Sequence, residues 1–365
     1  MRIAQIAPLA EGVPPRRYGG TERVVSWLTE ELVERGHEVT LFASGDSETA
    51  AELVACVPWG LRLAGIRDPT ASHLAMLEDV RRREAEFDVI HFHIDLLQFS
   101  VFRSSSQARL TTAHGRMDLP DSAPVYRTFP EMPLVSISNN QRVFAPLGTN
   151  WVDTIYHGLP TSAAPFIARG GDYLAFLGRI APEKRPDRAI EIATRAGIPL
   201  KIAAKIDSAD QAYFREVIQP LLDNPLVEFV GEIGDHEKGE FLGNALALLF
   251  PIDWPEPFGL VMIEAMAAGT PVIAWRAGSV PEIVDICVTG LIVDSLAGAV
   301  EAVEQAIALP RARVRQQFDK RFTAGRMADD YVRLYDRLLG GAETSLRFPQ
   351  VQPPHFPETA LRVGK

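Results

Sequence analysis

Short runs of apolar and β-branched residues alternate along the chain with longer stretches in which apolar positions recur every three or four residues. This alternation predicts strands and helices in turn, and it favours an α/β protein with parallel, doubly wound sheets. The predicted strands fall into two sets, the first at residues 2–7, 38–43, 88–93, 109–113 and 134–137 and the second at residues 173–177, 200–204, 227–230, 247–250, 272–274 and 291–293.

A segment rich in proline, glycine and small side chains, residues 157–171, separates the two sets of strands and suits an interdomain linker. We therefore predict an N-terminal Rossmann-like domain over residues 1–157 and a C-terminal one over residues 158–323, with a ligand in the cleft between them. A helix is expected within residues 324–341. Residues 342–365 hold four prolines and few apolar anchors, which indicates a loosely held tail.

One predicted helix, residues 260–268, is apolar at every position except Glu264, so we expect it to be buried on nearly every side. It should end at Gly269, with Pro271 just beyond. A buried carboxylate needs a cation, a pair of hydroxyl groups or a ligand beside it. The free N–H groups at the start of the same helix form an anion site, and Glu256 lies on the other side of that site.

The residues alone leave two interpretations of these carboxylates open. In the structural one, Glu256 caps a loop and Glu264 pairs with an arginine. In the functional one, a diphosphate binds at the helix start, Glu264 binds the hydroxyls of its ribose, and Glu256 holds a second hydroxylated group.

Several motifs accompany the helix. The two glutamates form an E-x7-E element, and residues 267–274 follow the pattern A-x-G-x-P-V-I-A. Residues 177–185 read LGRIAPEKR, residues 18–20 read YGG, and residues 277–284 read AGSVPEIV. In their order along the chain, these motifs resemble those of the retaining GT-B glycosyltransferases of family 4, the glycosyl transferases group 1, over about residues 1–340.

This resemblance implies a GT-B fold, in which two Rossmann-like domains face a central cleft. It implies transfer of a hexose from a nucleotide diphosphate sugar, by default a UDP sugar, to an acceptor hydroxyl with retention of configuration. The donor is expected in the C-terminal domain and the acceptor in the N-terminal domain, to which the helix within residues 324–341 crosses back. No cofactor, metal or covalent nucleophile is expected, because side chains supply the cations and the leaving phosphate helps to deprotonate the acceptor.

Arg179 and Lys184 follow a strand and suit a diphosphate, since arginine offers forked donors and lysine a mobile charge. A surface pair of Lys184 with Glu183 or Asp187 is the structural alternative. The resemblance brings His114 to the donor sugar near the reacting carbon. The predicted site residues are His114, Glu256, Arg179 and Lys184 for catalysis, and Gly19, Gly20, Arg179, Lys184, Glu256, Phe258, Gly259, Leu260 and Glu264 for donor binding.

Three further sequence patterns have both a structural and a ligand-binding interpretation. The first strand leads into a long loop rather than a G-x-G-x-x-G turn, which disfavours binding of NAD or FAD. Gly19 and Gly20 at the end of this loop either let backbone N–H groups approach a phosphate or form a flexible turn. The H-x-H at residues 91–93 has no evident third metal ligand, so a buried structural role is favoured. Ser279 and Glu282 are spaced as a capping box, and the resemblance also allows their turn to line the pocket.

Composition and charge limit the classes of partner that the protein is expected to bind. A net charge of −10 and a pI near 5.4 argue against nucleic acid. The chain has two cysteines and no apolar run near the roughly 20 residues of a membrane span, so we expect a cytoplasmic protein without a transmembrane segment. The basic clusters at 81–83 and 311–321 indicate solvated helix faces or, alternatively, peripheral contact with anionic lipid.

The acceptor stays open between lipid, oligosaccharide, small metabolite and protein. Two rival functions also stay open. One is a GT-B sugar-nucleotide epimerase or phosphorylase, and the other is a non-catalytic protein that binds a nucleotide sugar.

Overall fold

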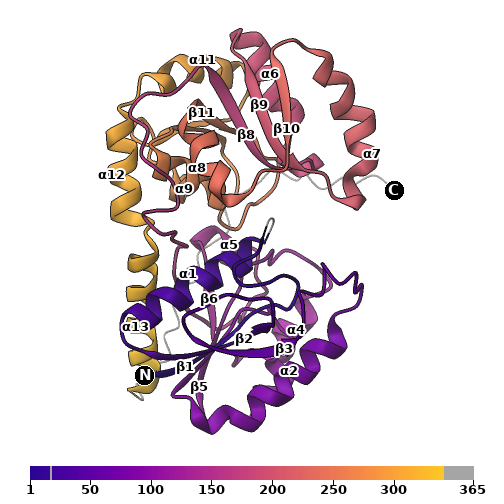
Figure 1. Cartoon of the computed structure of the whole chain (residues 1–365), viewed down its shortest axis with the longest axis vertical. Coiled ribbons are helices and arrows are strands. Elements are labelled where there is room, and N and C mark those ends of the chain that lie inside the picture. Colours follow the sequence, from indigo (N-terminus) through magenta and orange to yellow (C-terminus); the bar gives the residue numbers. More distant parts are fainter. Residues whose placement is uncertain (17–18, 341–365) are drawn as a thin grey trace.

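The computed structural model describes residues 1–16 and 19–340 and contains two parallel β-sheets with helices on their faces (Figure 1). The first sheet has seven strands in the order β3-β2-β1-β4-β5-β6-β7, all of them paired in parallel. These strands are β1 (Arg2–Ile6), β2 (Glu38–Ser44), β3 (Glu52–Val57), β4 (Val89–Phe92), β5 (Ala108–Thr112), β6 (Leu134–Ser136) and β7 (Trp151–Thr154).

The second sheet has six parallel strands in the order β10-β9-β8-β11-β12-β13. They are β8 (Tyr173–Arg179), β9 (Leu200–Lys205), β10 (Val227–Gly231), β11 (Ala245–Phe250), β12 (Val272–Trp275) and β13 (Gly290–Val293). We call each sheet with the elements packed on it a lobe, N-terminal for β1–β7 and C-terminal for β8–β13. The predicted doubly wound α/β class is confirmed.

Two strands were not predicted, β3 and β7, and both lie at the edges of the N-terminal sheet. No residue of β3 is fully buried, and β7 has only four residues. Edge strands bury one side less completely than central strands, so their apolar runs are weaker.

The helices cover the faces of the sheets. In the N-terminal lobe they are α1 (Gly20–Glu34), α2 (Thr70–Arg83), α3 (Phe99–Phe102), α4 (Ala123–Thr128) and α5 (Asn139–Val143). In the C-terminal lobe they are α6 (Pro186–Ala196), α7 (Gln211–Tyr213), α8 (Asp235–Gly243), α9 (Leu260–Ala268), α10 (Val280–Ile283), α11 (Leu296–Ile307) and α12 (Arg311–Arg321). None of the described helices is long and apolar enough to cross a membrane.

The last described helix, α13 (Ala324–Leu339), packs on the N-terminal lobe beside α1, although it follows the C-terminal lobe in sequence (Figure 1). Its strongly amphipathic pattern explains this position, because a wide apolar face must be buried. The residues of α13 that enter the core around Ile3, Val24 and Leu28 are Met327, Ala328, Tyr331, Leu334 and Tyr335.

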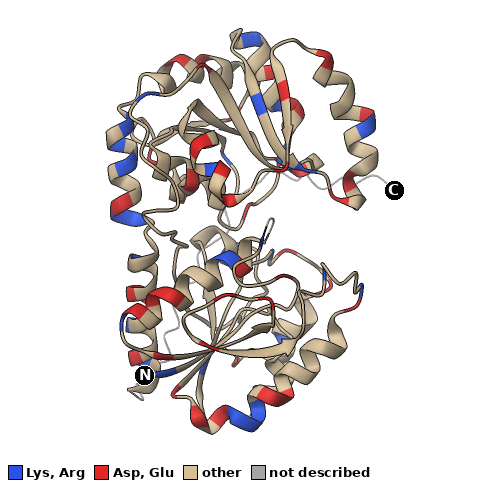
Figure 2. Cartoon of the chain, viewed as in Figure 1, with Lys and Arg blue, Asp and Glu red and all other residues tan. Residues whose placement is uncertain are grey.

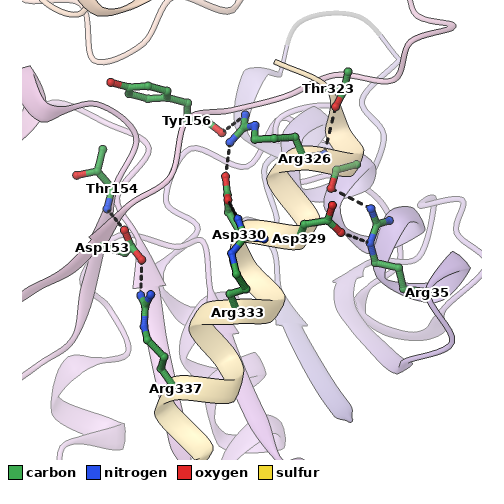
Figure 3. A network of polar contacts seen from close by, with 11 residues as sticks. Arg35, Asp153, Thr154, Tyr156, Thr323, Arg326, Asp329, Asp330, Arg333 and Arg337 are labelled. Carbon is green, nitrogen blue, oxygen red and sulfur yellow. Dashed lines mark hydrogen bonds and ion pairs between the residues drawn. The ribbon is translucent and has the colours of Figure 1, made fainter. Parts of the chain in front are cut away.

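Polar contacts fix the outer side of α13 (Figure 3). Arg337 forms an ion pair with Asp153, and Arg35 of α1 donates to Asp329 at 2.9 Å. Arg326 donates to the backbone carbonyl of Tyr156 at 2.8 Å. These contacts tie the helix to the strand β7, to α1 and to the segment that leaves the N-terminal lobe.

The chain passes between the lobes twice, and the two passages lie side by side. Leu159 donates its N–H to Phe322 at 3.0 Å, and Ala324 donates to the carbonyl of Leu159 at 2.9 Å. A Cβ atom at Gly158 would lie 2.2 Å from the carbonyl oxygen of Thr323, so only glycine allows this close approach. The predicted tail, residues 342–365, and Tyr18 of the YGG motif lie outside the described residues.

Charges of both signs are interspersed over the helices (Figure 2). The arginines at 81–83 sit at the end of α2 and pair with Glu78, Glu86 and Glu52. The expectation of a solvated face is wrong for Arg311 and Arg315 of α12. Arg311 donates to the carbonyl oxygens of Gly243 (2.6 Å) and Ala245 (2.8 Å), and Arg315 donates to that of Ala267 (2.7 Å). These guanidinium groups satisfy carbonyls left open near the ends of α8 and α9.

Candidate active site

A cavity of about 580 Å³ lies between the lobes, which is within the usual range for small-molecule sites. It is bounded by residues just after β1 and β5 and by the ends of β8 and β9, the edge at which parallel sheets bind ligands. All of the residues that the sequence predicted for the site line this cavity, namely Gly19, Gly20, His114, Arg179, Lys184, Glu256, Phe258, Gly259, Leu260 and Glu264.

Two helix N-termini open into the cavity. The helix α9 starts directly after Gly259, which has a φ of 81° and would bring a Cβ atom within 2.7 Å of Met262. The helix α1 starts at Gly20, where a Cβ atom would lie 3.6 Å from the side chain of Leu260 at the start of α9. Since free N–H groups and the positive end of the dipole favour anions, the two starts together make an electropositive corner.

Lys184 and Glu256 form an ion pair at the wall of the cavity. The Nε1–H of Trp254 donates to the same carboxylate at 3.0 Å, and the Lys184 ammonium lies 4.7 Å from the centre of a Trp254 ring. The surface pairs that the sequence allowed for Lys184 are not formed, because Glu183 pairs with Arg179 and Asp187 with Arg185. Lys184 is thus directed toward Glu256 and Trp254 at the cavity wall.

Arg179 ends β8 and is surrounded by carboxylates. It lies 2.9 Å from Glu183 and 3.4 Å from both Asp207 and Asp210. Although burial opposes it, Lys205 and Arg179 together lower the pKa of Asp207 below its ordinary value. The guanidinium group is therefore held in one orientation at the edge of the cavity, with these carboxylates fixing its position.

Glu264 faces a lysine rather than the arginine of the structural interpretation. Lys238 of α8 places its Nζ 3.7 Å from Glu264 Oε1 and 3.0 Å from Asp235. Asp235 in turn binds Arg23 of α1 at 2.7 Å, and the Arg23 side chain is only 5% exposed. Glu264 of α9, Lys238 and Asp235 of α8 and Arg23 of α1 therefore form a row of alternating charges. Glu264 is the end of this row that lies next to the predicted anion site.

His114 follows β5 and lines the cavity from the N-terminal lobe. Its ring stacks on that of His157, with centroids 5.2 Å apart and planes 18° apart, and the rings of His157 and Phe258 pack in a T-shaped arrangement with centroids 4.9 Å apart. The Nε2 atom of His114 lies 2.8 Å from Nδ1 of His93. Burial lowers the pKa of His114 to about 3, so this ring is neutral near pH 7.

The H-x-H pair is a buried hydrogen-bonded unit. His91 contacts Tyr335 at 2.8 Å and Thr112 at 2.7 Å, and these contacts use both of its ring nitrogens. Burial lowers the pKa values of His91 and His93 well below the ordinary value. Within the described part of the chain, no group of three or more His, Cys, Asp or Glu side chains is arranged to hold a metal ion. The favoured structural role is the one observed.

The loop at residues 256–259 is held from both lobes. Ser138 donates to the carbonyl of Pro257 at 2.6 Å, and Ser279 donates to that of Phe258 at 2.7 Å. Gly278 packs so closely that a Cβ would lie 2.3 Å from the backbone nitrogen of Glu256. The turn at 277–284 therefore supports the loop from behind, and its residues do not line the cavity.

The predicted capping box of Ser279 and Glu282 is wrong. The Ser279 hydroxyl is used by the loop, and the Glu282 carboxylate accepts the N–H groups of Asn139 and Asn140, both at 2.7 Å. It also accepts the hydroxyl of Tyr156 at 2.9 Å. Glu282 thus caps the start of α5 in the other lobe, a contact that sequence spacing within one helix does not reveal.

Lys238, Trp254 and His157 were missed from the sequence. Trp254 had a weak signal, since it lies in the loop that follows β11, whereas Lys238 lies within the helix α8. His157 had the position of a linker residue. Its burial and its stacking on His114 depend on the arrangement of the two lobes.

Two parallel α/β lobes with a ligand-sized cavity at the ends of their strands define a GT-B glycosyltransferase fold. Comparisons with known proteins agree. The model for glycosyl transferases group 1 matches residues 162–321, and the model for glycosyltransferase family 4 matches residues 18–156. The chain belongs to this family, and it is a glycosyltransferase.

Similar proteins cover most of the chain. A phosphatidyl-myo-inositol mannosyltransferase of Mycolicibacterium smegmatis is 26% identical over 302 residues, 75% of this chain and 76% of the relative. The crystal structure of AviGT4, a glycosyltransferase involved in avilamycin A biosynthesis, is 24% identical and has a TM-score of 0.75 over 94% of this chain and 99% of that chain. The structure of HepE of Anabaena in complex with UDP and glucose is 15% identical with a TM-score of 0.70 over 92% and 100%.

Proposed function

We propose that the protein transfers a hexose from a nucleotide diphosphate sugar to an acceptor hydroxyl and retains the anomeric configuration. One observation carries the proposal: the starts of α1 and α9 meet at one cavity together with Arg179 and Lys184. Helix N-termini and paired cations favour a diphosphate. Glu264, one helical turn further along α9, suits the hydroxyls of a ribose.

In this proposal the C-terminal lobe binds the donor. Arg179 and Lys184 bind the diphosphate, and Glu264 binds the ribose. Glu256 and the backbone from Phe258 to Leu260 bind the sugar, while Gly19, Gly20 and His114 complete the site from the N-terminal lobe. As the sugar leaves, charge grows on the distal phosphate. Preorganised cations stabilise that charge, and one such donor is worth about 3 kcal/mol, or roughly a hundredfold in rate.

Retention follows in this proposal from a front-face substitution. The C–O bond between sugar and phosphate breaks, the acceptor oxygen bonds to the same face of the anomeric carbon, and the acceptor proton passes to the leaving phosphate. Glu256 is not assigned as a covalent nucleophile, because it is paired with Lys184 and Trp254. We propose that side-chain cations supply the positive charge and that the protein works in the cytoplasm.

A UDP sugar is the favoured donor, and HepE, a protein of the same fold, was crystallised with UDP and glucose. The acceptor class is not assigned. The M. smegmatis relative is named for a phosphatidyl-inositol substrate, which keeps a lipid acceptor, and with it peripheral membrane contact, among the options to test.

The test is a panel of UDP, GDP and ADP sugars incubated with the protein, with and without sugar or lipid acceptors, while nucleotide release is followed. NMR of the product then gives the anomeric configuration. Release that depends on an acceptor supports transfer. Release of nucleotide and interconversion of the sugar without an acceptor would point to an epimerase, and a thermal shift without turnover would point to a non-catalytic binding protein. No release and no thermal shift with any donor would remove the proposal.

A further inference from the structure

A chain of buried hydrogen bonds connects α13 to His114 at the cavity. Gln5 of β1 donates its amide Nε2–H to the hydroxyl of Tyr335 at 3.3 Å, and its Oε1 lies 2.7 Å from Nε2 of His93. Nδ1 of His93 lies 2.8 Å from Nε2 of His114. Gln5 and His93 are buried, with 0% and 2% of their surface exposed. They do not line the cavity, so they act on a ligand only through His114.

The hydrogens in this chain have one consistent arrangement. The Oε1 of Gln5 can only accept, so His93 must carry its hydrogen on Nε2. Burial keeps His93 neutral, so its Nδ1 is a bare acceptor. The hydrogen between the two rings must then belong to Nε2 of His114, and a neutral His114 has a lone pair on Nδ1.

The other end of the chain agrees with this direction. Tyr335 accepts from Gln5 and has its own hydroxyl hydrogen for Nδ1 of His91, 2.8 Å away. His91 then donates from Nε2 to Thr112 at 2.7 Å, and Thr112 donates to Tyr331 at 2.7 Å. Each of these hydrogen bonds then has one donor and one acceptor.

Nδ1 of His114 is the open end of the chain. No described residue is hydrogen-bonded to it, and its ring lines the cavity beneath His157. A ligand that meets Nδ1 must therefore supply a hydrogen. Hydroxyl groups can do this, whereas a carboxylate or phosphate oxygen would place one lone pair against another.

We infer that Gln5 and His93 are positioning residues that fix His114 in one tautomer, so that His114 accepts a hydrogen bond from a hydroxyl of the bound sugar. This inference rests on the proposed function and deepens it. The site should favour a sugar with a free hydroxyl at the position that faces His114, and it should reject a deoxy or anionic group there. The helix α13 contributes to sugar recognition through Tyr335 although it does not line the cavity.

The first test needs no substrate. Protein with isotope-labelled histidine is examined by NMR at about pH 7.5, where its unfolded histidines would also be neutral, and His114 is assigned by comparison with H114A. We expect a protonated Nε2 and a bare Nδ1 in His114. In Gln5→Met the acceptor for His93 is lost, so His93 should shift its hydrogen to Nδ1 and force the opposite tautomer on His114. Gln5→Glu retains an acceptor oxygen and should keep the wild-type signals.

The second test is kinetic. The donor of the panel that reacts fastest is compared with analogues that each lack one hydroxyl of the sugar, the C6 hydroxyl included. One deoxy donor should react about 10- to 100-fold more slowly than the parent donor with the wild type, in the range of a lost hydrogen bond in a polar site. Gln5→Met and H114A should remove most of that discrimination and lower kcat, with little change in the KM for the donor. Gln5→Glu should restore both.

The outcomes separate the two proposals. A protonated Nδ1 in the wild type, or equal rates with every deoxy donor, overturns the tautomer inference and leaves sugar transfer intact. If no donor of the full panel is turned over, the proposed function fails and the sugar hydroxyl fails with it, even when the spectrum shows a bare Nδ1. Should Gln5→Met not fold, the wild-type spectrum and the comparison of H114A with wild type on deoxy donors still decide the matter.

Discussion

The ammonium group of Lys184 and the carboxylate of Glu256 form an ion pair across the cavity wall, and each side chain is less than one-fifth exposed, 16% and 12%. From the sequence the two were expected to bind different parts of a ligand, the diphosphate and the sugar. In the proposed function, this ion pair couples the two parts of the donor. We propose that a phosphate that binds Lys184 leaves Glu256 free to accept a hydroxyl of the sugar.

Replacing Lys184 tests the charge at the phosphate. Lys184→Ala should lower kcat/KM about a hundredfold, the usual effect of losing one preorganised donor to a developing charge. Steady-state kinetics with the best donor of the panel measure it. Lys320→Ala, which removes an exposed lysine of α12, is the matched control and should behave as wild type. A Lys184→Ala enzyme with unchanged kcat/KM would contradict its assignment.

The coupling itself is tested by a double-mutant cycle. Residues in one ion pair give non-additive effects, with interaction energies of about 0.5–3 kcal/mol. We expect the loss in Lys184→Ala/Glu256→Gln to be smaller than the two single losses combined. Strictly additive losses would show that the two residues act independently during turnover.

Glu264 and Glu256 should differ in the kinetic constant that they affect. Glu264→Ala should weaken binding of the free nucleoside diphosphate, measured by calorimetry, because it loses the acceptor for the ribose hydroxyls. Glu256→Ala should chiefly lower kcat, because its partner is the sugar that moves. Glu240→Ala on the exposed side of α8 is the control. Wild-type behaviour in both variants would remove both assignments.

The parts of the site that the sequence could predict are those carried by one segment. The apolar run at 260–268 with Gly259 before it and Gly269 after it predicts a buried helix with an open N-terminus, and α9 has these bounds. Its single carboxylate, Glu264, could be predicted to need a partner. The partner itself could not, because Lys238 comes from α8 and approaches only when the C-terminal lobe is folded.

Contacts between residues of different lobes could not be predicted from the sequence for the same reason. Glu282 fits a local capping box by spacing, yet its carboxylate caps α5 of the other lobe. His157 fits a linker by composition, yet it is buried, and its ring packs against those of His114 and Phe258 from the two lobes. A local sequence pattern indicates only the contacts that a residue can make within its own segment. In the structure, Glu282 and His157 make contacts with residues of the other lobe, which the sequence pattern does not bring near them.

Removing Glu282 should loosen the contact between the lobes. Its carboxylate accepts two backbone N–H groups at a helix start, and hydrogen bonds to a charged group are worth about 1.5–3 kcal/mol each. Glu282→Ala should therefore lower the thermal midpoint by several degrees, and kcat should fall because the loop at 256–259 is held from the same side. Differential scanning calorimetry and kinetics measure the two effects. Glu301→Ala on the exposed face of α11 is the control, and an equal midpoint in both variants would show that the contact adds nothing.

Acid should destabilise the fold through its buried histidines. Burial lowers the pKa values of His91, His93 and His157 well below their ordinary value of about 6.5, that of His114 to about 3, and also that of His73. Below about pH 6.5 the unfolded chain takes up protons that the folded chain refuses, so stability is complete above this pH and is lost as the pH falls. Each such histidine contributes about 1.4 kcal/mol per pH unit. The urea midpoint of unfolding should therefore be markedly lower at about pH 5.5 than at about pH 7.5. The control variant His236→Gln, which removes an exposed histidine, should show the same fall in its midpoint. A midpoint that does not change between these two pH values would mean that these histidines are charged in the folded protein, and the hydrogen-bond chain to His114 would then have to run differently.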